Sequence, residues 1–220
     1  MKNKSGLLST KTMVLVAVLT SLVVVLQLLG SFIRFGPFSI SLVLVPIVIG
    51  AAVCGSVAGA WLGFAFGLAV LLSGDAAAFL AVNPFGTIVT VILKGTVAGL
   101  LAGLIYKYLS VACKKFGEIR KTIKVEWLEV SVSQLIRFLP VVASAIICPV
   151  VNTGIFLIGC RLFFYDTIAA WGAGLGFANA AEYMFLGLAG GNFIFELLTN
   201  LVLAPVIVRL LAINKKIFNF

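Results

Sequence analysis

The amino-acid sequence predicts an all-α integral membrane protein in which six transmembrane helices form a compact bundle. Of 220 residues, 62% are hydrophobic and only 10% are charged, whereas soluble domains carry about 25% charged residues. The mean hydropathy is +1.23, and the apolar residues lie in segments near the roughly 20 residues that cross a bilayer. We therefore expect one transmembrane domain over residues 1–220, surrounded by the lipid bilayer. A soluble enzyme and a partner of nucleic acid are excluded.

The first predicted span covers residues 13–29. Basic residues precede it, at Lys2, Lys4 and Lys11, as they would in a signal peptide. No small-x-small cleavage site follows the apolar run, and the run is long for a signal sequence. We therefore interpret it as a retained membrane span.

The next apolar stretch is too long for a single span, so we expect a tight reversal at Cys54–Gly55 that divides it. This gives a second span over 40–54 and a third over 55–72. After Asn83–Pro84, which indicates a helix start, the fourth span covers 85–108.

The C-terminal half contains two further predicted spans, over 135–158 and 193–212. Between the fourth and fifth spans, 107–134 is polar and is predicted to be a loop. Between the fifth and sixth, 167–191 is rich in glycine and contains Glu182. Glycine-rich backbone suits a structured segment packed against protein better than a lipid-facing helix, so we expect a structured extracellular loop there.

The basic residues predict the orientation, because cytoplasmic loops carry an excess of Lys and Arg. With six spans, both termini and the 107–134 loop lie on one side with most of the 16 basic residues. The other side keeps only Arg34 and Arg161. We therefore expect both termini in the cytoplasm.

Small residues recur every four positions in three of the predicted spans. This spacing places them on one helix face and allows close backbone approach, so it predicts helix–helix contacts. In the first span such a patch suits either the bundle interior or another membrane protein. The residues are Ala17 and Ser21 in the first span, Gly55, Gly59, Gly63 and Gly67 in the third, and Gly95, Gly99 and Gly103 in the fourth.

Polar residues on three predicted spans fall at similar depth in the outer half of the bilayer. They are Lys94, Asn152, Asn192, Glu196 and Asn200. A charge near the bilayer centre costs roughly 2.5–3.5 kcal/mol and needs a partner or a wet cavity. Two interpretations follow: a structural Lys94–Glu196 ion pair, or a solute pocket that opens outward. We favour the pocket, because apolar side chains could replace a purely structural pair.

The outward-facing segments supply aromatic, amide and basic side chains that suit recognition loops over such a pocket. The candidates are Arg34, Asn83, Arg161, Trp171, Asn179 and Tyr183. The chain has no histidine, its four cysteines are scattered, and it has no phosphate-binding loop. We therefore expect no metal, no cofactor and no ATP hydrolysis by the chain itself.

The chain resembles the S components, the substrate-capture subunits, of energy-coupling-factor (ECF) vitamin transporters. The resemblance rests on the span pattern, on Val16–Ser21 after a basic start, and on Ser41–Ala51 followed by spaced glycines. It implies capture of a small water-soluble vitamin outside a prokaryotic cell, at the plasma membrane. It also implies a membrane scaffold subunit and two cytoplasmic ATPases as partners. Ala17 and Ser21 match the family's Ala-x-x-x-Ala, which contacts that scaffold.

Residues 83–87 and 148–154 look most like the pantothenate-type branch, and Arg34, Lys94 and Arg161 would meet its carboxylate. Riboflavin, a pyridoxine-type vitamer and a cobalamin-type ligand stay open. The alternative function is a self-sufficient ion-coupled secondary transporter or channel, with Lys94 and Glu196 as an ion relay. The absence of two related halves in the sequence argues against it.

Overall fold

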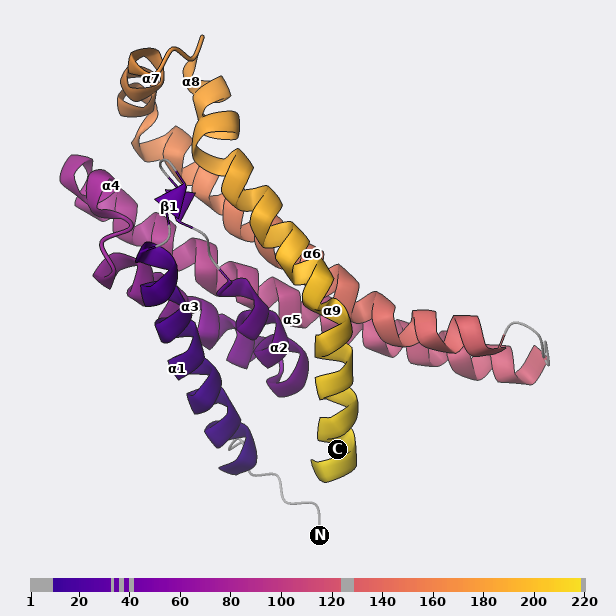
Figure 1. The fold of residues 1–220 in the computed structure, drawn as a ribbon. Coiled ribbons are helices and arrows are strands. Elements are labelled where there is room, and N and C mark those ends of the chain that lie inside the picture. The colour runs from indigo at the N-terminus through magenta and orange to yellow at the C-terminus, as the bar shows by residue number, and fades with distance from the viewer. Residues whose placement is uncertain (1–9, 33, 36–37, 40–41, 124–128, 219–220) are drawn as a thin grey trace.

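The structure, a computed structural model, describes residues 10–32, 34–35, 38–39, 42–123 and 129–218. They form a helical bundle with one small antiparallel hairpin, in which Arg34 pairs with Ser39 and Phe35 with Phe38. Figure 1 shows that the first helix begins and the last helix ends at the same end of the bundle. In chain order the elements are α1 (Thr10–Phe32), β1 (Arg34–Phe35), β2 (Phe38–Ser39), α2 (Leu44–Cys54), α3 (Ser56–Leu72), α4 (Ala77–Val82), α5 (Pro84–Ile123), α6 (Glu129–Phe163), α7 (Tyr165–Gly174), α8 (Ala180–Glu182), a π-helix (Tyr183–Gly190) and α9 (Gly191–Phe218).

Four helical segments within the described residues are long and apolar enough to cross a membrane: Thr10–Phe32, Pro84–Phe116, Phe138–Phe163 and Ala180–Arg209. The second and third predicted spans correspond to α2 and α3, which have only 11 and 17 residues. The predicted reversal between them is confirmed, because Gly55 adopts φ +94° between the two helices. The all-helical architecture is thus established, while the count of six spans stays a prediction.

The predicted 107–134 loop is wrong as a loop, because α5 continues to Ile123 and α6 already begins at Glu129. Lys, Arg and Glu are good helix formers, so a polar composition here marks helix outside the lipid rather than irregular chain. In Figure 1, α5 and α6 project side by side beyond the rest of the bundle.

The predicted loop over 167–191 is also corrected. It begins with α7 and turns at Gly176, which has φ +84°. From Ala180 onward the chain is helical, through α8 and the π-helix, directly into α9. The last helical segment therefore starts well before the predicted boundary at 193. Its glycines fit because they pack closely: a Cβ on Gly172 or Gly187 would collide with the ring or Cβ of Tyr183.

The α3–α5 contact is built from facing glycines, as the four-residue spacing predicts. A Cβ on Gly63 would overlap the carbonyl oxygen of Gly95, and a Cβ on Gly95 would overlap the carbonyl oxygen of Gly63. Gly59 and Gly99 face each other in the same reciprocal way. The two backbones therefore touch directly, which fixes the relative position of α3 and α5.

Two hydrophobic clusters organise the interior. The larger one joins α1, α2, α3, α5, α6 and α9, and includes the fully buried Val23, Ile47 and Leu62. The smaller one lies around α7 and the π-helix, with Phe164, Ile168 and Tyr183 among its members. The functional site described below is lined by residues of both clusters.

Candidate functional site

A cavity lies where the two clusters meet. Its walls come from α1, α3, α4 with the two residues before it, α5, α6, the π-helix and α9. The cavity volume accessible to water is about 150 Å³, whereas a single water molecule needs roughly 10–15 Å³ on the same measure. It can therefore hold several waters or one small solute. Its lining residues are Gln27, Phe66, Val70, Asp75, Ala76, Phe79, Thr87, Thr90, Val91, Lys94, Asn152, Thr153, Phe156, Cys160, Phe164, Leu188, Ala189, Asn192 and Glu196.

Lys94 enters the cavity between two aromatic rings. Its Nζ lies 5.5 Å from the centre of the Phe66 ring and 5.4 Å from that of Phe156. Such cation–π contacts stabilise an ammonium by about 0.5–2 kcal/mol. Among the described residues no carboxylate oxygen lies within 4.0 Å of this ammonium, so Lys94 and Glu196 do not form a direct ion pair.

Glu196 is almost fully buried, with 2% of its surface exposed, and it holds two side-chain amides. Its carboxylate accepts a hydrogen bond from Asn192 Nδ2 at 3.2 Å and one from Asn152 Nδ2 at 3.5 Å. Asn200 Nδ2 donates to the backbone carbonyl of Glu196 at 3.0 Å. The four-residue spacing on α9 thus joins α9 to α6 through a polar network in an otherwise apolar bundle.

This network leaves polar atoms without partners. Within the described part of the chain, the buried side-chain oxygens without a hydrogen-bond partner are Thr90 Oγ1, Asn152 Oδ1, Asn192 Oδ1 and Asn200 Oδ1. A buried polar atom without a partner costs about 1–3 kcal/mol, and such exceptions are few in native proteins. Three of the four belong to residues that line the cavity, so the exceptions concentrate at one place.

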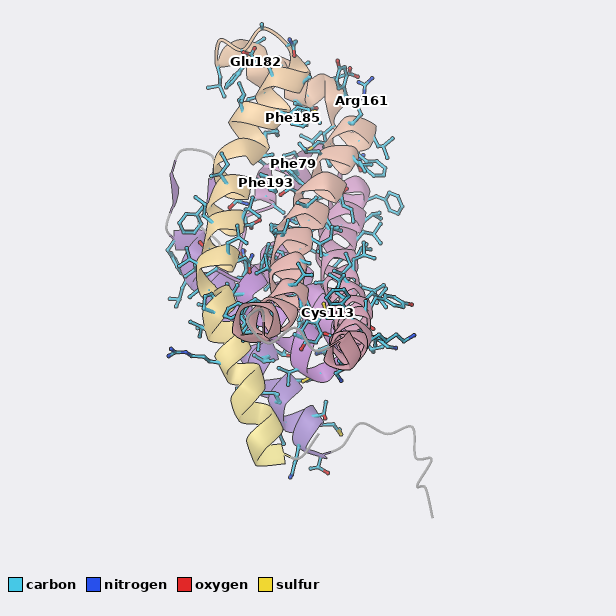
Figure 2. All side chains as sticks on the ribbon, turned by 90° about the vertical axis from the view of Figure 1, so that its right-hand side faces the viewer. Phe79, Cys113, Arg161, Glu182, Phe185 and Phe193 are labelled. Carbon is cyan, nitrogen blue, oxygen red and sulfur yellow. The ribbon has the colours of Figure 1, made fainter. Side chains whose placement is uncertain are left out.

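An aromatic cluster and one polar contact form a further part of the cavity wall. Phe79 of α4 makes edge-on contacts with Phe156, Phe164 and Trp171, at centroid distances of 5.8, 5.1 and 5.5 Å. In Figure 2, Phe79 lies among the helices rather than on their outer surface. Gln27 of α1 donates a hydrogen bond to Asp75 Oδ2 at 2.6 Å, which joins α1 to the segment before α4.

Four of the residues predicted from sequence meet in this cavity: Lys94, Asn152, Asn192 and Glu196. Asn200 is buried one turn further along α9 and supports Glu196 without lining the cavity. The polar residues predicted at similar depth on three spans therefore lie close together in the structure.

The residues predicted on the outward-facing segments do not line the cavity where the structure describes their side chains. Asn83 accepts a hydrogen bond from the Gly86 amide at the start of α5, and Asn179 caps α8. Arg161 stacks on the Tyr165 ring at 4.0 Å and lies at the edge of the helices in Figure 2. Trp171 and Tyr183 pack in the smaller hydrophobic cluster behind the lining. The side chain of Arg34 is outside the described part of the chain.

Sequence reasoning missed several lining residues, among them Gln27, Phe66, Thr90 and Phe156. Two signals were available. Gln27 is an amide that interrupts an apolar span, and Phe156 lies four residues after Asn152 and so on the same face of α6. No sequence signal distinguishes Phe66 from the lipid-facing aromatic residues of the chain.

An apolar helical bundle with a polar, partly unsatisfied cavity is typical of membrane proteins that bind a small solute. The chain belongs to the family of ECF transporter substrate-specific components, whose family model matches residues 11–211. The resemblance predicted from sequence is therefore confirmed. Members of this family are substrate-binding subunits of transporters that work with an ECF module, so the chain is not an enzyme.

A solved structure shows the same fold. ThiT from Listeria monocytogenes superposes with a TM-score of 0.62 over 94% of this chain and 96% of that chain, at 20% sequence identity. At that identity the likeness concerns the fold alone. A search of curated protein sequences gave no significant match.

Proposed function

We propose that this chain captures a small water-soluble vitamin or vitamin precursor outside a prokaryotic cell, for ATP-driven uptake through an ECF module in the plasma membrane. The observation that carries the proposal is the cavity, in which Lys94, Asn152, Asn192 and Glu196 gather inside an apolar bundle. Unpartnered polar atoms there are satisfied when a polar ligand binds. Six spans with both termini in the cytoplasm would place this cavity toward the outside.

Pantothenate is the first ligand to test. Its hydroxyls and amide suit the amides around Glu196, and its size suits a small cavity. Neither the family description nor the ThiT structure names it, so its support is the sequence likeness of residues 83–87 and 148–154 to that branch. Isothermal titration of the purified chain with a panel of water-soluble vitamins tests the proposal. Absence of binding to every member would contradict it.

The partners that we propose are a membrane scaffold subunit and two cytoplasmic ATPases. On α1 the residues Leu19, Val23 and Gln27 are buried against the bundle, whereas Ala17 and Ser21 are exposed on another face. Small residues on an exposed membrane face allow close approach of a partner helix. Co-purification of ATPases with the chain is expected. A self-sufficient secondary transporter would purify without them and still transport in vesicles.

Replacing Ala17 or Ser21 with Trp is expected to abolish uptake while leaving ligand affinity unchanged, because the bulk blocks the partner and not the cavity. Radiolabelled uptake in cells and titration of the purified variant check the two parts. Leu72→Trp, at an exposed position near the end of α3, is the matched control and should retain uptake. Loss of ligand binding in the α1 variants would place these residues in the internal packing instead.

A further inference from the structure

The charged groups of the cavity are not equally satisfied. Glu196 accepts hydrogen bonds from two amides, Asn192 and Asn152. Asp75 accepts one from Gln27 at 2.6 Å. Both carboxylates therefore have donors from the protein itself.

Lys94 has no equivalent. An ammonium carries three N–H donors, and the rings of Phe66 and Phe156 attract its charge without accepting an N–H···O bond. No oxygen of the described residues takes a hydrogen bond from its Nζ. Lys94 is thus the one charged group of the described cavity lining that lacks a polar partner, in a bundle where an uncompensated charge is costly.

A second unpartnered group lies beside it. Thr90 precedes Lys94 by four residues on α5, so both lie on the same face of that helix, and both line the cavity. The Thr90 hydroxyl is buried and has no hydrogen-bond partner. An ammonium and a hydroxyl on one face form a two-donor site for an anionic oxygen pair.

The nearby carboxylates limit the charge of that anion. Glu196 and Asp75 line the same cavity, and a phosphate dianion would meet two like charges while facing a single ammonium. A monoanion balances Lys94 with less repulsion. The donor set also lacks the arginine fork or backbone amides that phosphate sites use.

We propose that the site selects the acid form of its ligand: a small monocarboxylate whose carboxylate binds Lys94 Nζ and Thr90 Oγ1. This inference rests on the proposed vitamin-capture function and narrows it to one substrate class. Glu196 then holds Asn152 and Asn192 in the cavity wall rather than pairing with Lys94.

The test is isothermal titration of the full chain with acid and neutral members of matched pairs: nicotinate and nicotinamide, pantothenate and panthenol, biotin and biotinamide. At least one acid should bind about 10-fold or more tightly than its neutral partner. Lys94→Met should remove that preference by weakening the acid and sparing the neutral compound. Lys107→Met, an exposed lysine on the same helix outside the cavity, is the matched control and should keep the preference.

The outcomes separate the two proposals. Equal or tighter binding of the neutral members, or an unchanged preference in a folded Lys94→Met variant, overturns the inference. Binding of thiamine, riboflavin or pyridoxine with no binding of any acid keeps vitamin capture and overturns the carboxylate site. No binding of any vitamin contradicts both. If Lys94→Met does not fold, the preference of the unmodified chain alone decides.

Discussion

The glycine contact and the cavity both involve α3 and α5, but the contact is made by residues without a side chain and the cavity is lined on these helices by larger side chains. Along α3 and α5, Gly63 and Gly95 remove all side-chain volume and bring the backbones into contact. Phe66 directly precedes Gly67 on α3, and Lys94 directly precedes Gly95 on α5. The side chains of Phe66 and Lys94 line the cavity. Adjacent residues on an α-helix point about 100° apart, so each helix uses one face for packing and the next for the cavity.

The close contact of α3 and α5 holds the backbone that carries Phe66 and Lys94 into the cavity wall. Lys94 directly precedes Gly95, whose backbone contacts that of Gly63 on α3. The distance between the Lys94 backbone and α3 therefore cannot vary freely. The cavity differs from this contact in that several of its polar atoms have no partner among the described residues. Stability and binding therefore reside in neighbouring but separable sets of residues, and variants of each set should separate them.

Replacing Gly63 with Leu should have the largest effect. Its Cβ would overlap the Gly95 carbonyl oxygen, and backbone cannot move aside as a flexible side chain can. Overpacking usually costs 1–3 kcal/mol and more where nothing can relax, so we expect a loss of at least about 3 kcal/mol and little folded protein. Yield of monodisperse protein and thermal unfolding in detergent measure it.

Gly154→Ala is the control, because no atom lies within 4 Å of a Cβ built at Gly154 in α6. Alanine in a helix is favoured over glycine by roughly 0.5–1 kcal/mol, so this variant should be as stable as the parent or more so. If Gly63→Leu unfolds at the same temperature as Gly154→Ala, the close contact of α3 and α5 does not hold.

Glu196→Ala tests the cavity side of the comparison and should have an intermediate effect. It leaves the amides of Asn152 and Asn192 without their acceptor, at about 1–3 kcal/mol of unfolding free energy. Glu182→Ala is the matched carboxylate, because Glu182 accepts one exposed backbone bond from Ala178 at 2.7 Å and should cost less. Denaturant or thermal unfolding compares the two. An equal loss would mean that the Glu196 network contributes no more than a surface cap.

The helical class, the reversal at Gly55 and the polar residues at similar depth on three spans were all predicted from the sequence. Each depends on a local property, namely hydropathy, glycine geometry and four-residue spacing. The helix ends at 107–134 and 167–191 were misplaced. Hydropathy reports where lipid ends, and a helix continues past that point when its polar residues are good helix formers. Glycine content likewise reports close packing as well as loops, as Gly187 against the Tyr183 ring shows.

Only some of the polar residues of the cavity were predicted from the sequence. Lys94, Asn152 and Glu196 stand out because a polar residue in an apolar span needs a reason. Phe66 and Phe156 do not stand out, because phenylalanine occurs facing lipid, in the protein core and in ligand sites alike. The exposed Phe85 and the cavity-lining Phe79 differ only in tertiary position.

Calorimetric titration of the double variant Lys94→Met/Glu196→Met with the tightest-binding vitamin of the screen tests directly whether this cavity is the ligand site. Removing both buried groups leaves no uncompensated charge, and losing the acceptor of Asn152 and Asn192 costs only about 1–3 kcal/mol, so the protein should still fold. Each charged hydrogen bond to a ligand contributes roughly 1.5–3 kcal/mol, so we expect the double variant to bind the vitamin about 10-fold or more weakly. Unchanged affinity in the folded double variant would contradict this expectation and place the ligand elsewhere in the bundle.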